Sequence, residues 1–139
     1  MNNVTLIKLN TIHLYLDTTK KIIYLEILNS LYSKEDSITM LEYFKNFWIL
    51  AKEQNVKYYL ILIVNHIGIY PLNFYLNLVT YLNNLNPIFS DHLIAFSFIC
   101  KDDGPINILK PLFNMYKFVR PYNICNSYEE ALQFFNKQN

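Results

Sequence analysis

Glycine is scarce in this sequence, with only Gly68 and Gly104 among 139 residues. The common phosphate-binding loops need several closely spaced glycines, as in G-x-G-x-x-G or G-x-x-x-x-G-K-[ST]. Neither pattern can be written with these two residues. The two most widespread nucleotide-binding classes are therefore excluded.

Cysteine and charge are also sparse. Two cysteines, Cys100 and Cys125, do not make a disulfide framework, and each lies in an apolar segment. We expect two buried free thiols of an intracellular protein. A disulfide between Cys100 and Cys125 is the alternative if their strands are neighbours. Charged residues make up 17%, the net charge is +1 and Arg120 is the single arginine, so no nucleic-acid partner is predicted.

Metal and catalytic patterns are absent as well. The histidines, His13, His66 and His92, include no pair at helical ligand spacing, and neither C-x-x-C nor G-x-S-x-G occurs. We predict no metal, no cofactor and no enzyme activity. An enzyme using His66 with Asp102 or Asp103 is a weaker hypothesis, since a loop histidine and a turn before a helix explain these residues.

No charged residue occurs between Tyr58 and Ser90. The purely apolar part, Tyr58 to Val64, is shorter than the roughly 20 residues that span a bilayer. The first residues also lack the basic start of a signal peptide. We therefore predict a cytoplasmic protein without membrane insertion.

Apolar residues are abundant, at 53% of the sequence. The length suits one domain over residues 1–139. The periodicity of the apolar residues predicts a hairpin followed by alternating helices and strands, which is an α/β fold with parallel strands. We expect a mixed sheet of 4–5 strands with about four helices. The predicted strands cover residues 12–16, 21–28, 56–64, 92–100 and 118–125, with 4–9 as a further strand or an ordered tail. The predicted helices cover 33–54, 71–84, 102–116 with a kink at Pro111, and 127 onward.

Two capping boxes mark helix starts, with Ser33 and Ser127 as N-caps and Asp36 reaching back to the first. The pair Asn86-Pro87 is expected to end the helix that begins near Pro71.

The C-terminal stretch carries a resemblance. The segments Ile108–Tyr116, Phe118–Ile124 and Asn126-Ser127-Tyr128-Glu129-Glu130-Ala131-Leu132 are similar to the closing helix, short strand and "s-x-e-e-A-l" helix of the STAS domain. This is the fold of bacterial anti-sigma-factor antagonists and of sulfate-transporter tails. The predicted element order resembles that fold over nearly the whole chain.

The resemblance does not extend to the family's switch. STAS domains place Asp-Ser-[Ser/Thr]-Gly at the start of the helix after the central strand, and its serine is phosphorylated. Here Tyr70-Pro71-Leu72-Asn73 stands there, without Ser or Thr. The resemblance therefore implies a STAS-like fold and a partner surface, without that charge switch.

Aromatic residues are abundant, at 12 Tyr, 10 Phe and 1 Trp, and two predicted helices are apolar beyond one face. Exposed apolar surface marks protein contacts. We predict a regulatory or scaffolding interaction module that binds a protein partner, including a membrane protein, or forms a homodimer. The predicted partner-binding residues are Tyr32, Ser33, Asn65, His66, Ile69, Tyr70, Asn73 and Phe74. The alternative is a carrier of a small apolar ligand or lipid, held between helices and sheet.

Overall fold

The computed structural model describes residues 3–65, 71–101 and 103–138. Three strands, β1 (Asn3–Lys8), β2 (Ile12–Asp17) and β3 (Ile22–Ile27), precede an alternation of helices and strands. The alternating elements are α1 (Lys34–Gln54), β4 (Tyr58–Ile63), α2 (Leu72–His92), β5 (Leu93–Ile99), α3 (Asp103–Met115), β6 (Tyr122–Cys125) and α4 (Tyr128–Asn136). This order confirms the predicted α/β class and the N-terminal hairpin.

All six strands form one sheet in chain order, β1-β2-β3-β4-β5-β6. The sheet has more strands than the predicted 4–5, because β1 pairs with β2 instead of forming a tail. The β1–β2 and β2–β3 pairs are antiparallel, whereas β3–β4, β4–β5 and β5–β6 are parallel. Parallel neighbours need a crossover, and α1, α2 and α3 supply the three crossovers.

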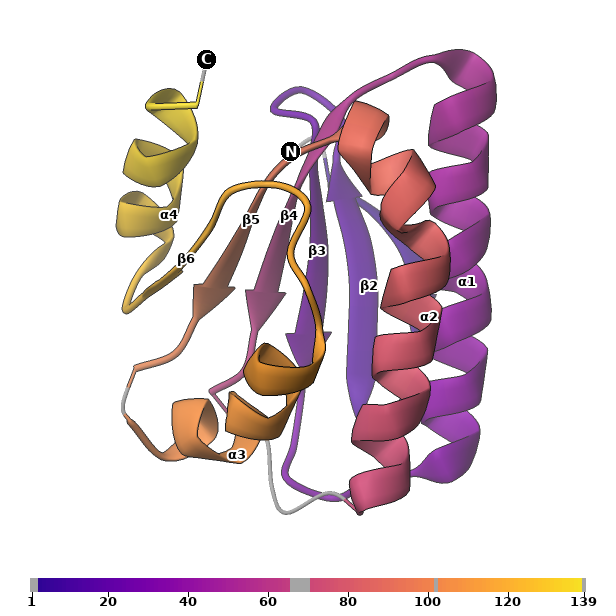
Figure 1. Cartoon of the computed structure of the whole chain (residues 1–139), viewed down its shortest axis with the longest axis vertical. Coiled ribbons are helices and arrows are strands. Elements are labelled where there is room, and N and C mark those ends of the chain that lie inside the picture. The colour runs from indigo at the N-terminus through magenta and orange to yellow at the C-terminus, as the bar shows by residue number, and fades with distance from the viewer. Residues whose placement is uncertain (1–2, 66–70, 102, 139) are drawn as a thin grey trace.

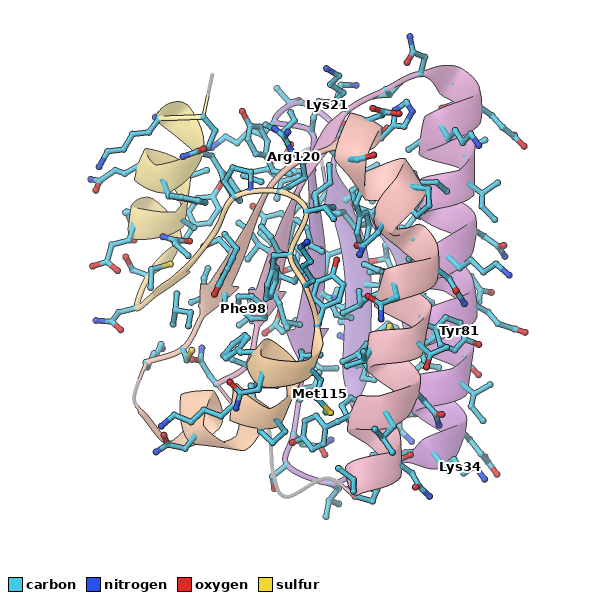
Figure 2. The ribbon with its side chains drawn as sticks, viewed as in Figure 1. Lys21, Lys34, Tyr81, Phe98, Met115 and Arg120 are labelled. Atoms are coloured by element: carbon cyan, nitrogen blue, oxygen red, sulfur yellow. The ribbon has the colours of Figure 1, made fainter. Side chains whose placement is uncertain are left out.

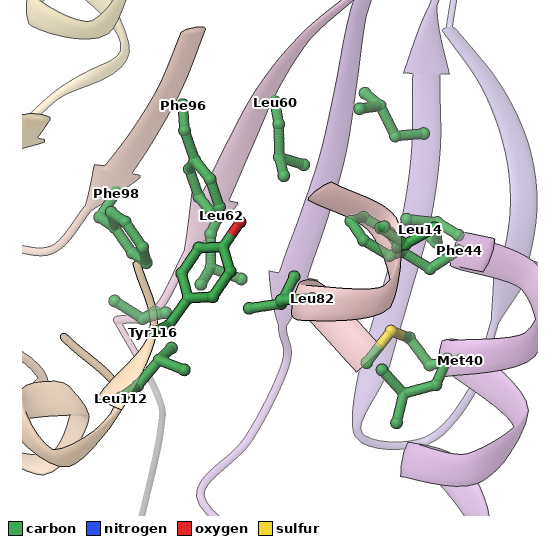
Figure 3. Packing of buried hydrophobic residues seen from close by; sticks show 14 of the residues in the cluster. Leu14, Met40, Phe44, Leu60, Leu62, Leu82, Phe96, Phe98, Leu112 and Tyr116 are labelled. Atoms are coloured by element: carbon green, nitrogen blue, oxygen red, sulfur yellow. The ribbon is translucent and has the colours of Figure 1, made fainter. Parts of the chain in front are cut away.

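The helices cover the two faces of the sheet unequally (Figure 1). We call the face under α1, α2 and α3 the front and the face under α4 the back. Strand alternation divides the apolar side chains between them: Leu60 and Leu62 of β4 join the front cluster, while Ile61 joins the back cluster. Figure 3 shows the front cluster, in which Leu60, Leu62 and Phe96 of the sheet lie toward the helices.

Helix α2 runs to His92, so the predicted stop at Asn86-Pro87 is wrong. Its last turns bury Phe89 completely, with the ring 5.1 Å from that of Trp48 on α1. Burying a phenylalanine is worth about 1.5–3 kcal/mol, which offsets much of the cost of a helical proline. As a result, β5 begins at Leu93 and His92 belongs to the helix.

The last strand is shorter than predicted, because only Tyr122–Cys125 pairs with β5 and the chain before Pro121 does not. Pro121 still accepts a hydrogen bond from the amide of Phe96 through its carbonyl, at 2.9 Å. Both cysteines are buried, Cys100 in the front cluster and Cys125 in the back cluster. Their side chains leave the sheet in opposite directions, so the two cysteines do not form a disulfide although β5 and β6 are neighbours.

Candidate functional site

Two of the predicted partner-binding segments meet at the edge of the sheet where the parallel strands end. The loop before α1 places the Tyr32 ring edge-on against the Phe74 ring of α2, with centroids 5.7 Å apart. Figure 2 shows Lys34, the first residue of α1, at this end of the molecule and Lys21 and Arg120 at the opposite end. We call this end the carboxyl edge.

Ser33 shapes the loop at the carboxyl edge. As predicted, it is the N-cap of α1, and its Oγ accepts a hydrogen bond from the amide of Asp36 at 3.2 Å. The Asp36 carboxylate, however, does not reach back to the cap. It accepts hydrogen bonds from Thr11, at 2.6 Å from the hydroxyl and 3.2 Å from the amide. Thr11 is buried just before β2, so this pair fixes the start of α1 on the sheet.

Asn65 joins the ends of two strands. Its Oδ1 accepts a hydrogen bond from the amide of Lys101 at 2.9 Å, and the amide of Val64 donates to the carbonyl of Ile99 at 3.0 Å. These bonds hold the chain after β4 beside the chain after β5. The half-buried Asn65 therefore has a structural role at the carboxyl edge, whether or not it also binds a partner.

The side chains that the carboxyl edge presents to solvent differ from part of the predicted set. Phe74 is only 8% exposed, so it supports Tyr32 from within the core, while Asn73 is exposed on the first turn of α2. Leu31 at 73% and Leu72 at 63% are the most exposed large apolar side chains in the described part of the chain. The predicted residues His66, Ile69 and Tyr70 lie outside the described residues.

The sequence pattern did not single out the exposed Leu31 and Leu72. On α2, Leu72 begins the helix and is exposed, although Tyr75 and Leu82 on the same stripe are buried. A helical projection of α2 therefore does not identify Leu72 as exposed.

An apolar cavity lies behind the carboxyl edge, between the front of the sheet and helices α1, α2 and α3. Its volume is about 50 Å³, and its lining includes Met40, Leu62, Phe74, Leu78 and Leu109. No polar atom contributes to the lining, so the cavity offers a water molecule no hydrogen-bond partner. The location is the one expected for an apolar ligand, between helices and sheet.

Three titratable side chains on the N-terminal strands, Tyr15, Tyr24 and His13, have pKa values shifted toward their neutral forms. The pKa of Tyr15 is raised by burial and by Glu26, whose carboxylate accepts a hydrogen bond from the Tyr15 hydroxyl at 3.2 Å. Burial and Tyr128 raise the pKa of Tyr24, and burial and Lys8 lower the pKa of His13. A tyrosine with a raised pKa is a weaker acid, so Tyr15 and Tyr24 keep their protons at neutral pH.

Metal-ligating side chains are dispersed. Within residues 3–65, 71–101 and 103–138, no group of three or more His, Cys, Asp or Glu side chains is placed to hold an ion. His92 is buried at the end of α2, and its Nδ1 has no hydrogen-bond partner among the described residues. The Asp102 and Asp103 side chains lie outside the described part of the chain.

No family model, no curated protein and no solved structure matches the chain. The STAS resemblance therefore rests on element order and on the residues from Ile108 onward. None of the helices among the described residues is both long and apolar enough to cross a membrane.

Proposed function

We propose that this protein is a non-enzymatic interaction module with a STAS-like fold, which binds a protein partner through the carboxyl edge in a regulatory or scaffolding role. The observation that carries the proposal is the pairing of Tyr32 with Phe74, which fixes the exposed Leu31 and Leu72 on either side of one contact. Exposed apolar side chains that lie together on a surface mark sites of protein contact. The STAS serine has no counterpart, so binding would not depend on phosphorylation there.

The test replaces both exposed leucines with aspartate, in Leu31→Asp/Leu72→Asp, and compares capture of partners from the source cells by quantitative mass spectrometry. The control is Leu50→Asp, since Leu50 is 48% exposed but lies about 25 Å along α1 from Ser33. We expect at least about tenfold less of a stoichiometric partner with the double variant and no loss with the control. Circular dichroism checks that both variants fold.

Equal capture by the double variant and the wild type would contradict the carboxyl edge as the binding surface. A partner similar to an anti-sigma factor or a membrane transporter would support the STAS-like role. Recovery of the tagged chain alone would favour self-association or the carrier function instead.

The apolar cavity supports a second candidate, a carrier of a small apolar ligand. Its volume of about 50 Å³ is roughly a third of the ~150 Å³ cavity that holds benzene in an engineered protein. A lipid chain would fit only if α2 or α3 moved away from the sheet. Native mass spectrometry tests this: a co-purified apolar mass supports the carrier, and a clean mass of the chain alone contradicts it.

A further inference from the structure

The edge of the sheet at β6 has no neighbouring strand among the described residues, because β6 ends the strand order. Helix α4 lies against β5 and β6 on the back of the sheet. Its Phe135 ring reaches the ring of Tyr59 in β4 and stacks on it at 4.4 Å. Tyr122 and Ile124 belong to this last strand, and both are 43% exposed.

The backbone of β6 alternates between β5 and solvent. The carbonyls of Pro121 and Cys125 accept hydrogen bonds from the amides of Phe96 and Cys100, each at 2.9 Å. In a parallel pair the bonding residues alternate, so Pro121, Asn123 and Cys125 face β5. The amide and carbonyl groups of Tyr122 and Ile124 consequently point outward, available to another strand.

The side chains on this edge are ordered and uncharged. The Tyr122 ring stacks on the Phe118 ring at 3.9 Å, so it is held in place before any partner arrives. From Pro121 to Tyr128 no residue carries a formal charge. Basic residues, Lys117 and Arg120, precede this neutral stretch, and acidic residues, Glu129 and Glu130, follow it.

These features favour one occupant, a second copy of this chain in antiparallel orientation. Antiparallel pairing brings the basic end of one neutral stretch toward the acidic end of the other, whereas parallel pairing would bring like charges together. A two-fold axis through Asn123 sets Tyr122 opposite Ile124 of the second copy, an aromatic–β-branched pair that stabilises antiparallel strands.

The opposite edge of the sheet is protected. Strand β1 pairs irregularly with β2, with a register shift between Thr5 and Ile7, and it ends at the charged Lys8. Bulges and lysines are the features by which edge strands avoid pairing with other chains. Strand β6 has regular register over its four residues and neither feature.

We propose that β6 is a self-association edge, at which two copies join their sheets by antiparallel pairing of Tyr122 and Ile124. Because β6 is short, the contact belongs to the small, reversible class of interfaces. This inference concerns a different surface from the carboxyl edge and does not rest on the proposed partner binding. Either proposal can fail without the other.

The experiment measures the sedimentation coefficient of the full chain as a function of concentration. The variant Ile124→Lys places a charge in the pair, and Val4→Lys, at the 49%-exposed Val4 of β1, is the matched control at the other edge. We expect a monomer–dimer equilibrium for wild type and control and at least about tenfold weaker dimerisation for Ile124→Lys. A wild type that stays monomeric, or a dimer that Ile124→Lys leaves unchanged, would overturn the proposal.

The register gives an independent readout. Asn123 would face its own copy across the axis as a non-hydrogen-bonded pair, with Cα atoms about 4.5 Å apart, a separation that a disulfide spans. In a chain with Cys100→Ala and Cys125→Ala, the variant Asn123→Cys should form a covalent dimer under mild oxidation. The same background with Asn126→Cys should not, and covalent dimers of equal yield from both would overturn this register.

Discussion

Phe74 and Asn73 are adjacent residues at the carboxyl edge with opposite environments. Substituting each in turn therefore distinguishes, at the residue scale, a contribution to folding stability from a contribution to binding. Phe74 is buried against Tyr32 and lines the cavity, whereas Asn73 is exposed. We expect Phe74→Ala to lower the free energy of unfolding by about 3–5 kcal/mol, and Asn73→Ala to change it by less than about 0.5 kcal/mol. Urea denaturation measures both, and a small effect of Phe74→Ala would contradict its place in the core.

Buried tyrosines lead to a second prediction at the residue scale, which concerns the loss of folding stability at alkaline pH. Burial raises the pKa of Tyr15, Tyr24 and Tyr116 above the ordinary value of 10.0. Above pH 10 the unfolded chain releases these protons while the native chain keeps them, so stability falls as the pH rises. We expect part of the tyrosinate absorbance to appear together with loss of the circular-dichroism signal. Complete titration of all tyrosines in a still-folded chain would disprove this.

Local sequence patterns predicted the roles of some residues and not of others, and the difference follows from how far along the chain each interaction reaches. The Ser33 and Ser127 caps depend on atoms three residues away, so the pattern predicted them. The burial of Phe74 depends on Tyr32, more than forty residues earlier in the chain. No local pattern contains that contact, and Leu72 and Phe74 were therefore not distinguished as outward and inward.

At the scale of elements, Asp36 connects α1 to the sheet and not only to its own cap. Its carboxylate accepts both hydrogen bonds from Thr11, a residue that is 6% exposed. We expect Asp36→Ala to cost about 1–3 kcal/mol, since it leaves a buried hydroxyl unpaired, and Ser33→Ala to cost about 1 kcal/mol. Chemical denaturation compares the two, with the exposed Ser30→Ala as control; a smaller cost for Asp36→Ala than for Ser33→Ala would contradict this link.

The limits of the elements show the same dependence on distant contacts. Hydrophobic periodicity predicted α1 to its last residue, because its caps and buried stripe are local. It failed at Pro87, where the packing of Phe89 on Trp48 continues α2 through the proline. It also predicted residues 4–9 only as either a strand or an ordered tail, because an edge strand depends on its pairing partner, which here is β2.

On the scale of the whole molecule, the two faces of the sheet share the same strands although their coverage differs. The single tryptophan, Trp48, is fully buried on the front, while Phe135 of α4 is 2% exposed on the back. Phe135 stacks on Tyr59, and the next residue of β4, Leu60, belongs to the front cluster. Loss of packing in the back cluster should therefore also weaken packing in the front cluster, because both clusters pack on β4.

We accordingly expect Phe135→Ala to lower the unfolding free energy by about 3–5 kcal/mol, and to shift the Trp48 fluorescence transition as far as the circular-dichroism transition. The half-buried Phe134 provides the control, since Phe134→Ala should shift both transitions less. An unchanged Trp48 transition beside a shifted circular-dichroism signal would mean that α4 unfolds separately. Coincident shifts would instead show that β3, β4 and β5, buried on both sides, make the two clusters one cooperative unit.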